Sequence, residues 1–213
     1  MKHYPVGIQD FQKLRSQNYL YVDKTAFAWQ VANGGGYYFL SRPRRFGKSL
    51  FLSTLEYLFQ GKEELFEGLY IKDKWDWSKK NPVIKISFSN IGHKLLGLEK
   101  AIDEKLEAIA RGFQHIFKAT TIDQKFRELI ETLASQQGPV VVLIDEYDKP
   151  IIDYLGTDTT TDGVPQAIEN REILKVFYSI LKDADPHLKL VFITGVSKFS
   201  RVSIFSDLNN LTD

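Results

Sequence analysis

The sequence contains no cysteine, which excludes disulfide bonds, zinc–thiolate sites and a cysteine nucleophile. It also lacks any apolar run near the roughly 20 residues that a membrane-spanning helix needs. The opening MKHYPVGIQDF lacks the apolar core of a secretory signal. The four histidines do not have the spacing of metal ligands. We therefore expect a cytoplasmic protein without a membrane partner, in which the histidines are structural or solvated.

A strong charge of one sign is missing as well. The 28 Lys and Arg residues nearly balance the 27 Asp and Glu residues, so the formal net charge is +1. This balance gives no overall attraction to nucleic acid or to a membrane, although it leaves room for a local basic patch. The longest loop-like stretch, residues 154–166, is rich in Thr, Asp and Gly and predicts a mobile loop.

Short apolar runs alternate with helical patterns along most of the chain. The runs predict buried strands at 37–40, 83–88, 140–144 and 188–193. The helical patterns cover 48–61, 98–113, 122–136 and 170–183. Strands this apolar need cover on both faces, and the alternation with helices supplies it. The predicted fold class is α/β, with a mainly parallel sheet sandwiched by helices.

The segment before the first strand predicts a helix after Asp23, whose carboxylate is placed to cap it. The glycine run 34–36 ends this helix and leads into the strand. We expect residues 1–36 to form an N-terminal segment that packs on a core of residues 37–213.

The stretch SRPRRFGKSL, residues 41–50, ends like a phosphate-binding loop, and it has the required context of a strand before it and a helix after it. Gly47 would let backbone N–H groups turn toward phosphate oxygens, Lys48 would reach the β- and γ-phosphates, and Ser49 would bind Mg²⁺. Arg42 stands where the common loop has its first glycine, but that glycine serves the turn, which Pro43 can also set.

Three arginines of this loop, Arg42, Arg44 and Arg45, crowd the predicted anion site. Phosphate, a nucleic-acid strand and solvent all remain open as their partners. The predicted nucleotide-binding residues are Arg44, Arg45, Phe46, Gly47, Lys48, Ser49 and Leu50.

A second motif, VVVLIDEYD, has the form of a strand with acids at its carboxyl end, where ligands bind in open α/β sheets. Asp145 would orient Mg²⁺, and Glu146 would polarise a water for attack on the γ-phosphate. The alternative is an acidic strand end without a metal. Asp148 either assists or pairs with Lys149.

The fourth strand leaves Thr194 at the same end of the sheet, where a hydroxyl could hold the attacking water or sense the γ-phosphate. Ser197 and Arg201 are further candidates for this role, and ordinary turn residues are the other interpretation. The predicted catalytic residues are therefore Glu146, Lys48 and Thr194, and the predicted metal ligands are Ser49 and Asp145.

With these residues the chain resembles the AAA-ATPase-like family of P-loop proteins, a bacterial group near the STAND and origin-recognition-type ATPases. The resemblance rests on five stretches in order: GIQDF (7–11), YLYVDKT (19–25), FLSRPRRFGKSL (39–50), LIDEYDKP (143–150) and FITGVSKFSRVSIFSDLNNL (192–211). In this family the loop R-P-R-R-F-G-K-S is the usual form.

The resemblance implies a P-loop core of the additional-strand, AAA-like type, in which the strand ending at Thr194 inserts between the first strand and the acidic one. It also implies a helical lid and often a C-terminal nuclease-like domain of the PD-(D/E)XK type, a route to nucleic acid. The sequence stops at Asp213, so we expect the lid to be missing from a truncated chain or incomplete copy.

The function expected from this reading is a Mg²⁺-dependent ATPase whose nucleotide state drives a conformational switch, with ATP and Mg²⁺ as cofactors and a homo-oligomer as a possible assembly. The alternatives are a nucleotide-gated protein- or DNA-binding module with little turnover and, less favoured, a small-molecule kinase. By family position only, Asp10, Tyr21, Asp23 and Lys24 are candidates for contacts with the base.

Overall fold

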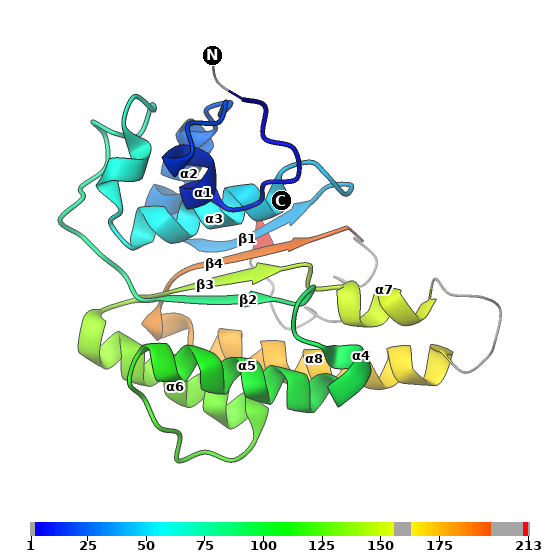
Figure 1. The fold of residues 1–213 in the computed structure, drawn as a ribbon. Coiled ribbons are helices and arrows are strands. Elements are labelled where there is room, and N and C mark those ends of the chain that lie inside the picture. The colour runs from blue at the N-terminus through cyan, green and yellow to red at the C-terminus, as the bar shows by residue number, and fades with distance from the viewer. Residues whose placement is uncertain (1–2, 156–162, 197–210, 213) are drawn as a thin grey trace.

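A five-stranded parallel sheet forms the centre of the molecule (Figure 1). The computed structural model describes residues 3–155, 163–196 and 211–212. The strands are β1 (Gly36–Ser41), β2 (Val83–Ser87), β3 (Val140–Asp145), β4 (Leu188–Gly195) and β5 (Leu211–Thr212). Their order is β2-β3-β4-β1-β5, and the paired strands are parallel. The predicted α/β class is confirmed, and β4 lies between β1 and β3 as the resemblance implies.

Helices cover both faces of the sheet (Figure 1). One face carries α1 (Phe11–Ser16), α2 (Thr25–Gly34) and α3 (Lys48–Phe59). The other face carries α4 (His93–Leu96), α5 (Leu98–Gly112), α6 (Ile122–Gln137) and α8 (Gly163–Asp183). Helix α7 (Lys149–Leu155) lies beside the carboxyl ends of the strands. Short 3-10 turns occupy Glu63–Phe66 and Asp185–His187.

Helix α8 begins earlier than the sequence predicts, at Gly163 and not near residue 170. The sequence pattern placed 163–166 in a loop because Gly163 and Pro165 are turn residues. A proline in the first turn of a helix costs no hydrogen bond, since the first N–H groups have no partner within the helix. Residues 156–162 of the predicted mobile loop lie outside the described residues.

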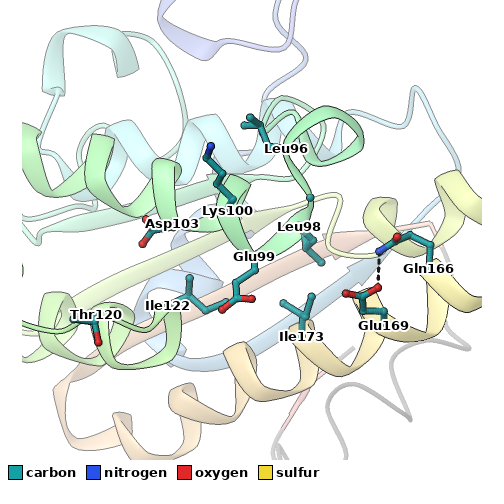
Figure 2. Close-up of a pocket in the computed structure, with 11 residues that line it drawn as sticks. Leu96, Leu98, Glu99, Lys100, Asp103, Thr120, Ile122, Gln166, Glu169 and Ile173 are labelled. Atoms are coloured by element: carbon teal, nitrogen blue, oxygen red, sulfur yellow. Dashed lines mark hydrogen bonds between the residues drawn. The ribbon is translucent and has the colours of Figure 1, made fainter.

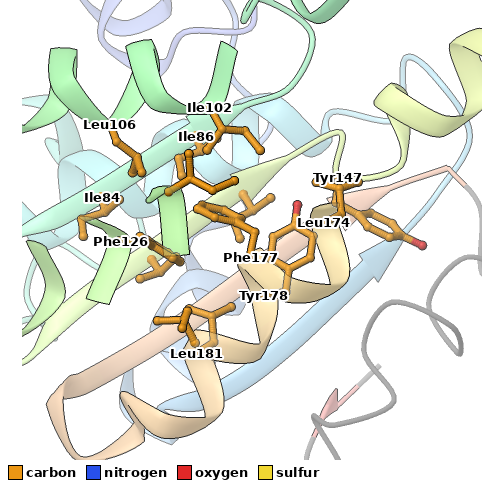
Figure 3. Close-up of a cluster of buried hydrophobic side chains, with 14 of the residues drawn as sticks. Ile84, Ile86, Ile102, Leu106, Phe126, Tyr147, Leu174, Phe177, Tyr178 and Leu181 are labelled. Carbon is orange, nitrogen blue, oxygen red and sulfur yellow. The ribbon is translucent and has the colours of Figure 1, made fainter. Parts of the chain in front are cut away.

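The larger buried cluster lies between the sheet and helices α5, α6 and α8 (Figure 3). Its centre is the stacked pair Phe126 and Phe177, whose ring centroids are 4.5 Å apart. Ile84 and Ile86 of β2 point to this side of the sheet, and both are completely buried. Removal of this apolar surface from water holds the three helices on the sheet and thereby fixes the strands whose ends carry the acidic motif.

The opposite cluster joins α3 and the N-terminal segment to the sheet. Leu52, Leu55 and Leu58 of α3 are fully buried. Phe11 of α1 belongs to the same cluster, and its backbone N–H donates to Ser53 Oγ of α3 at 3.0 Å. The N-terminal segment thus packs on α3, the helix that follows the phosphate-binding loop.

Asp23 lies one residue before the N-cap of α2, which is Lys24. Its Oδ1 accepts hydrogen bonds from the backbone N–H and the hydroxyl of Thr25, at 2.8 and 2.7 Å. Its Oδ2 accepts from the backbone N–H of Tyr70 at 2.7 Å. Asp23 therefore stabilises the start of α2, as expected, but it does so from outside the cap position and also holds the segment around Tyr70.

Within the part of the chain that the structure describes, no helix combines the length and the apolar character needed to cross a bilayer.

Candidate functional site

The predicted phosphate-binding loop and the acidic strand end lie where the parallel strands have their carboxyl ends, here called the carboxyl edge of the sheet. In a parallel sheet these ends share one edge, and here β1 leads into the loop before α3 while β3 leads into α7 (Figure 1). Ser41 of β1 stands beside Gly195 of β4, and Ile144 of β3 stands beside Ile193. β4 thus links the phosphate-binding loop to the acidic strand end.

The loop between β1 and α3 folds around the side chain of Lys48. The Lys48 side chain is buried, and its ammonium donates to the backbone carbonyls of Arg42 at 2.8 Å and Pro43 at 3.0 Å. Gly47 has a φ of 77°, in the left-handed region that glycine adopts without strain, and it forms the N-cap of α3. The ammonium and the N-terminus of α3 therefore meet in one loop, the arrangement expected of an anion site.

The unusual arginine of this loop is Arg45 and not Arg42. Arg45 has a φ of 68°, whereas the φ of Arg42 is not positive. The backbone N–H of Arg42 donates to the carbonyl of Gly195 at 3.3 Å, and Ser41 Oγ donates to the carbonyl of Val196 at 3.1 Å. No glycine is needed at position 42, because the chain there continues the pairing of β1 with β4.

The other predicted loop residues differ in their exposure. Arg44, Arg45 and Phe46 are exposed, and 67% of the Phe46 surface is open to solvent. Ser49 and Leu50, in the first turn of α3, are half-buried. The arginines therefore remain accessible, and Ser49 lies directly after Lys48 at the start of the helix.

Three predicted residues are joined by hydrogen bonds across β3 and β4. The hydroxyl of Thr194 donates to Asp145 Oδ1 at 2.5 Å, and the backbone N–H of Glu146 donates to the same hydroxyl oxygen at 3.4 Å. Asp145 and Thr194 are buried. Thr194 thus orients one carboxylate oxygen of Asp145 and the backbone of Glu146.

Glu146 lies under the electrostatic influence of both halves of the candidate site. Burial, with the charge of Asp145 beside it, raises the pKa of the Glu146 carboxyl above its usual value. The cations Lys149, Lys48 and Arg44 oppose this shift. A carboxylate with a raised pKa is a better proton acceptor. The phosphate-binding loop and the residue after Glu146 are both attached to the end of β4, because the backbone N–H of Arg42 donates to the carbonyl of Gly195 and that of Tyr147 donates to the carbonyl of Thr194. Glu146 itself has a φ of 53°, which is uncommon for a residue other than glycine.

Several secondary candidates have structural roles. Asp10 is the N-cap of α1, and its Oδ2 also accepts from Tyr57 Oη at 3.1 Å. Tyr21 packs edge-on against Phe11. Asp148 is buried and its Oδ2 accepts from the backbone N–H of Val196 at 2.9 Å.

Lys149, which the sequence suggested as a partner of Asp148, forms an ion pair with Asp153. Ser197 and Arg201, which the sequence suggested for the role of Thr194, lie outside the described residues.

Sequence reasoning missed Gly195, which stands beside the acidic motif. A Cβ atom at Gly195 would lie 2.3 Å from Cε1 and 2.5 Å from Cδ1 of Tyr147. The Tyr147 ring is fully buried and packs edge-on against Phe39, so it has no free space to enter. Sequence spacing alone gives no signal for such an approach between a glycine and a ring 48 residues away.

We expect Gly195→Ala to destabilise the protein by about 1–3 kcal/mol, the usual cost of inserting a methyl group into a packed core. Urea denaturation of the variant and the parent measures this difference. Gly112→Ala is the matched control, since a Cβ there meets no atom within 4 Å. Equal stabilities of the Gly195 variant and the parent would contradict the packing described here.

A cavity of about 520 Å³ lies apart from these residues, between the first turns of α5 and the helix α8 (Figure 2). Leu98 and Ile173 lie between the carboxylates of Glu99 and Glu169 in this region. The cavity shares no lining residue with the predicted nucleotide site.

Among the described residues, no group of three or more His, Asp or Glu side chains is placed to hold a metal ion. In nucleotide sites Mg²⁺ is commonly bound by one or two protein ligands together with the phosphates. Asp145 and Ser49 are the residues predicted for that mode, in which the nucleotide would supply the other ligands.

Comparisons with known proteins show the family of the chain. A family model described as "Predicted AAA-ATPase" matches residues 5–205. The chain is 47% identical over 215 residues to a protein of Azotobacter chroococcum mcd 1 described as "Uncharacterized protein in vnfD 5'region". This match covers the whole chain but only 40% of the relative. No solved structure matches the chain significantly. The match to the family model extends over both motifs of the site, and the chain belongs to the AAA-ATPase-like family.

Proposed function

We propose that this protein binds ATP together with Mg²⁺ at the carboxyl edge of the sheet and hydrolyses it, and that the nucleotide state drives a conformational switch. The observation that carries the proposal is the convergence of two distant parts of the chain at the end of β4. Thr194 orients Asp145 and the Glu146 backbone, while the next residue, Gly195, accepts the backbone N–H of Arg42 in the phosphate-binding loop.

Each residue has a distinct task in this proposal. Lys48 exchanges its contacts with the loop carbonyls for the β- and γ-phosphates, and the N-terminal N–H groups of α3 bind phosphate oxygens. Ser49 and Asp145 hold Mg²⁺, which when bound neutralises charge on the phosphates. Glu146 accepts the proton of the attacking water. Thr194 holds Asp145 and the backbone of Glu146 in position through its hydrogen bonds. Arg44, Arg45, Phe46 and Leu50 complete the nucleotide contacts.

A nucleotide-gated binding module with little turnover is the second candidate. It is favoured by the exposure of Arg44, Arg45 and Phe46, because exposed guanidinium groups beside an aromatic ring suit a phosphate-rich or acidic partner. A salt-dependent affinity for DNA would support that partner, and an affinity unchanged by added salt would argue against phosphate contacts. A homo-oligomeric assembly is likewise part of what we propose.

Calorimetric titration with ATP and GTP, each with and without Mg²⁺, tests the proposed function. We expect ATP to bind with Mg²⁺ present and to bind more weakly without it, since the metal held by Ser49 and Asp145 would neutralise charge on the phosphates. We expect ATP to bind more tightly than GTP because the chain belongs to the AAA-ATPase-like family. Absence of binding heat with either nucleotide, in protein that melts cooperatively, would overturn the proposal.

A further inference from the structure

Helix α7 begins three residues after Glu146 and carries a lysine at its first position. The backbone N–H of Lys149 donates to the carbonyl of Glu146 at 3.0 Å, so the two residues are held close together. Of the cations that lower the pKa of Glu146, Lys149 has the largest effect. The Lys149 ammonium is therefore a candidate partner for Glu146, and an ion pair between them would block the carboxylate oxygen that water must approach.

The Lys149 ammonium pairs instead with a residue further along its own helix. Its Nζ lies 2.9 Å from Oδ1 of Asp153, one helical turn further along α7. The Asp153 side chain is only 13% exposed, which favours a persistent ion pair over one that solvent screens. Burial alone would raise the pKa of Asp153, but the hydrogen bond and charge of Lys149 lower it. Asp153 is therefore ionised and paired at neutral pH.

Helix α4 fixes Asp153 from its other side. Oδ2 of Asp153 lies 3.4 Å from Nε2 of His93 and 3.8 Å from Nζ of Lys94. His93 is buried, and burial lowers its pKa, so its ring is neutral at neutral pH. Lys94 is half exposed and more distant. Lys149 is thus the main counter-charge of Asp153, and the ring of His93 limits the positions that Asp153 can adopt.

We propose that Asp153 is a positioning residue for the candidate active site: it holds the Lys149 ammonium along α7 and so leaves the Glu146 carboxylate free to accept a proton from water. The inference rests on the proposed function for its catalytic consequence. Its structural content, that Lys149 turns to Glu146 when Asp153 loses its charge, stands separately. No reaction step passes through Asp153 itself.

Asp153→Asn tests the catalytic consequence. This change keeps the size of the side chain but releases Lys149, and we expect kcat for ATP hydrolysis to fall by about tenfold or more with KM nearly unchanged, because general-base catalysis contributes about 10²–10⁴-fold. The double variant Asp153→Asn with Lys149→Met is expected to regain most of the rate, since the competing ammonium is gone. Asp183→Asn, which breaks the remote pair with Arg127, is the control and should leave kcat unchanged.

A double variant as slow as Asp153→Asn would overturn the inference, because the loss would then come from Asp153 itself or from misfolding. A rise in KM without a fall in kcat would overturn it as well.

A second measurement separates this inference from the proposed function, since it needs no hydrolysis. In protein with ¹³C-labelled lysine, the ε-methylene signal of Lys149 reports its ion-pair partner. We expect Glu146→Gln to leave this signal in place in the parent and to move it in the Asp153→Asn background, where Lys149 pairs with Glu146. An unmoved signal in that background would overturn the inference even if the protein hydrolyses ATP. A moved signal in a protein that does not hydrolyse ATP would support the turn of Lys149 toward Glu146 and overturn only its catalytic consequence.

Discussion

Replacement of Lys48 by alanine is expected to weaken ATP binding by about 30- to 5,000-fold, because loss of one partner from a buried charge contact costs about 2–5 kcal/mol. The Lys48 ammonium is buried within the loop and held by two backbone carbonyls, so the side chain is already ordered before it exchanges these contacts for phosphate, and it loses little conformational entropy on binding. Calorimetric titration of the variant and the parent with ATP and Mg²⁺ measures the loss.

Two controls make this result specific. Lys62→Ala removes an exposed lysine just beyond the opposite end of α3 and should leave the affinity for ATP unchanged. The melting temperature of Lys48→Ala without nucleotide should remain close to that of the parent, since both carbonyls can turn to water at the exposed loop. Parental affinity in the Lys48 variant would remove the phosphate-binding loop from the proposed function.

Replacement of Glu146 by glutamine is expected to lower the rate of phosphate release in a single turnover by about 10²–10⁴-fold, the usual contribution of a general base. The amide keeps the shape of the side chain but accepts no proton, so ATP should still bind at close to parental affinity. Rapid-quench measurement with excess protein separates this step from product release.

Glu104→Gln, an exposed change on α5, serves as the matched control for this charge removal. Hydrolysis at the parental rate in Glu146→Gln would show that another group activates the water. Very slow release from the parent itself, with tight binding, would favour the nucleotide-gated module over the ATPase.

The strands and most helices follow from the sequence because their signals are local. The run at 140–144 is apolar throughout, and all residues of β3 are buried. The position of β4 between β1 and β3 followed from the family resemblance and not from residue patterns, since strand order depends on contacts between distant segments. The early start of α8 was missed because Pro165 and Gly163 suit both a turn and a first helical turn.

The sequence predicted the residue types of the candidate site and the end of the sheet at which they lie, but not their hydrogen bonds and ion pairs. Motif spacing predicted that Lys48, Asp145 and Thr194 share one edge, and the parallel sheet explains why they do. The sequence directed attention to Arg42, whereas the backbone outlier is Arg45. The pairing of Lys149 with Asp153 was also missed. The carboxylates of Asp148 and Asp153 both lie near Lys149 in the sequence, and only the directions of the side chains decide which of them it pairs with.

The last two residues of β4 have a mechanical consequence. Thr194 bonds to the acidic end of β3, and Gly195 accepts the backbone N–H of Arg42 in the phosphate-binding loop. Successive residues in a strand are about 3.3 Å apart, so the two attachments lie on adjacent residues. A displacement of the loop that moves the backbone of Gly195 would therefore also act on the contact between Thr194 and Asp145 at the end of β3.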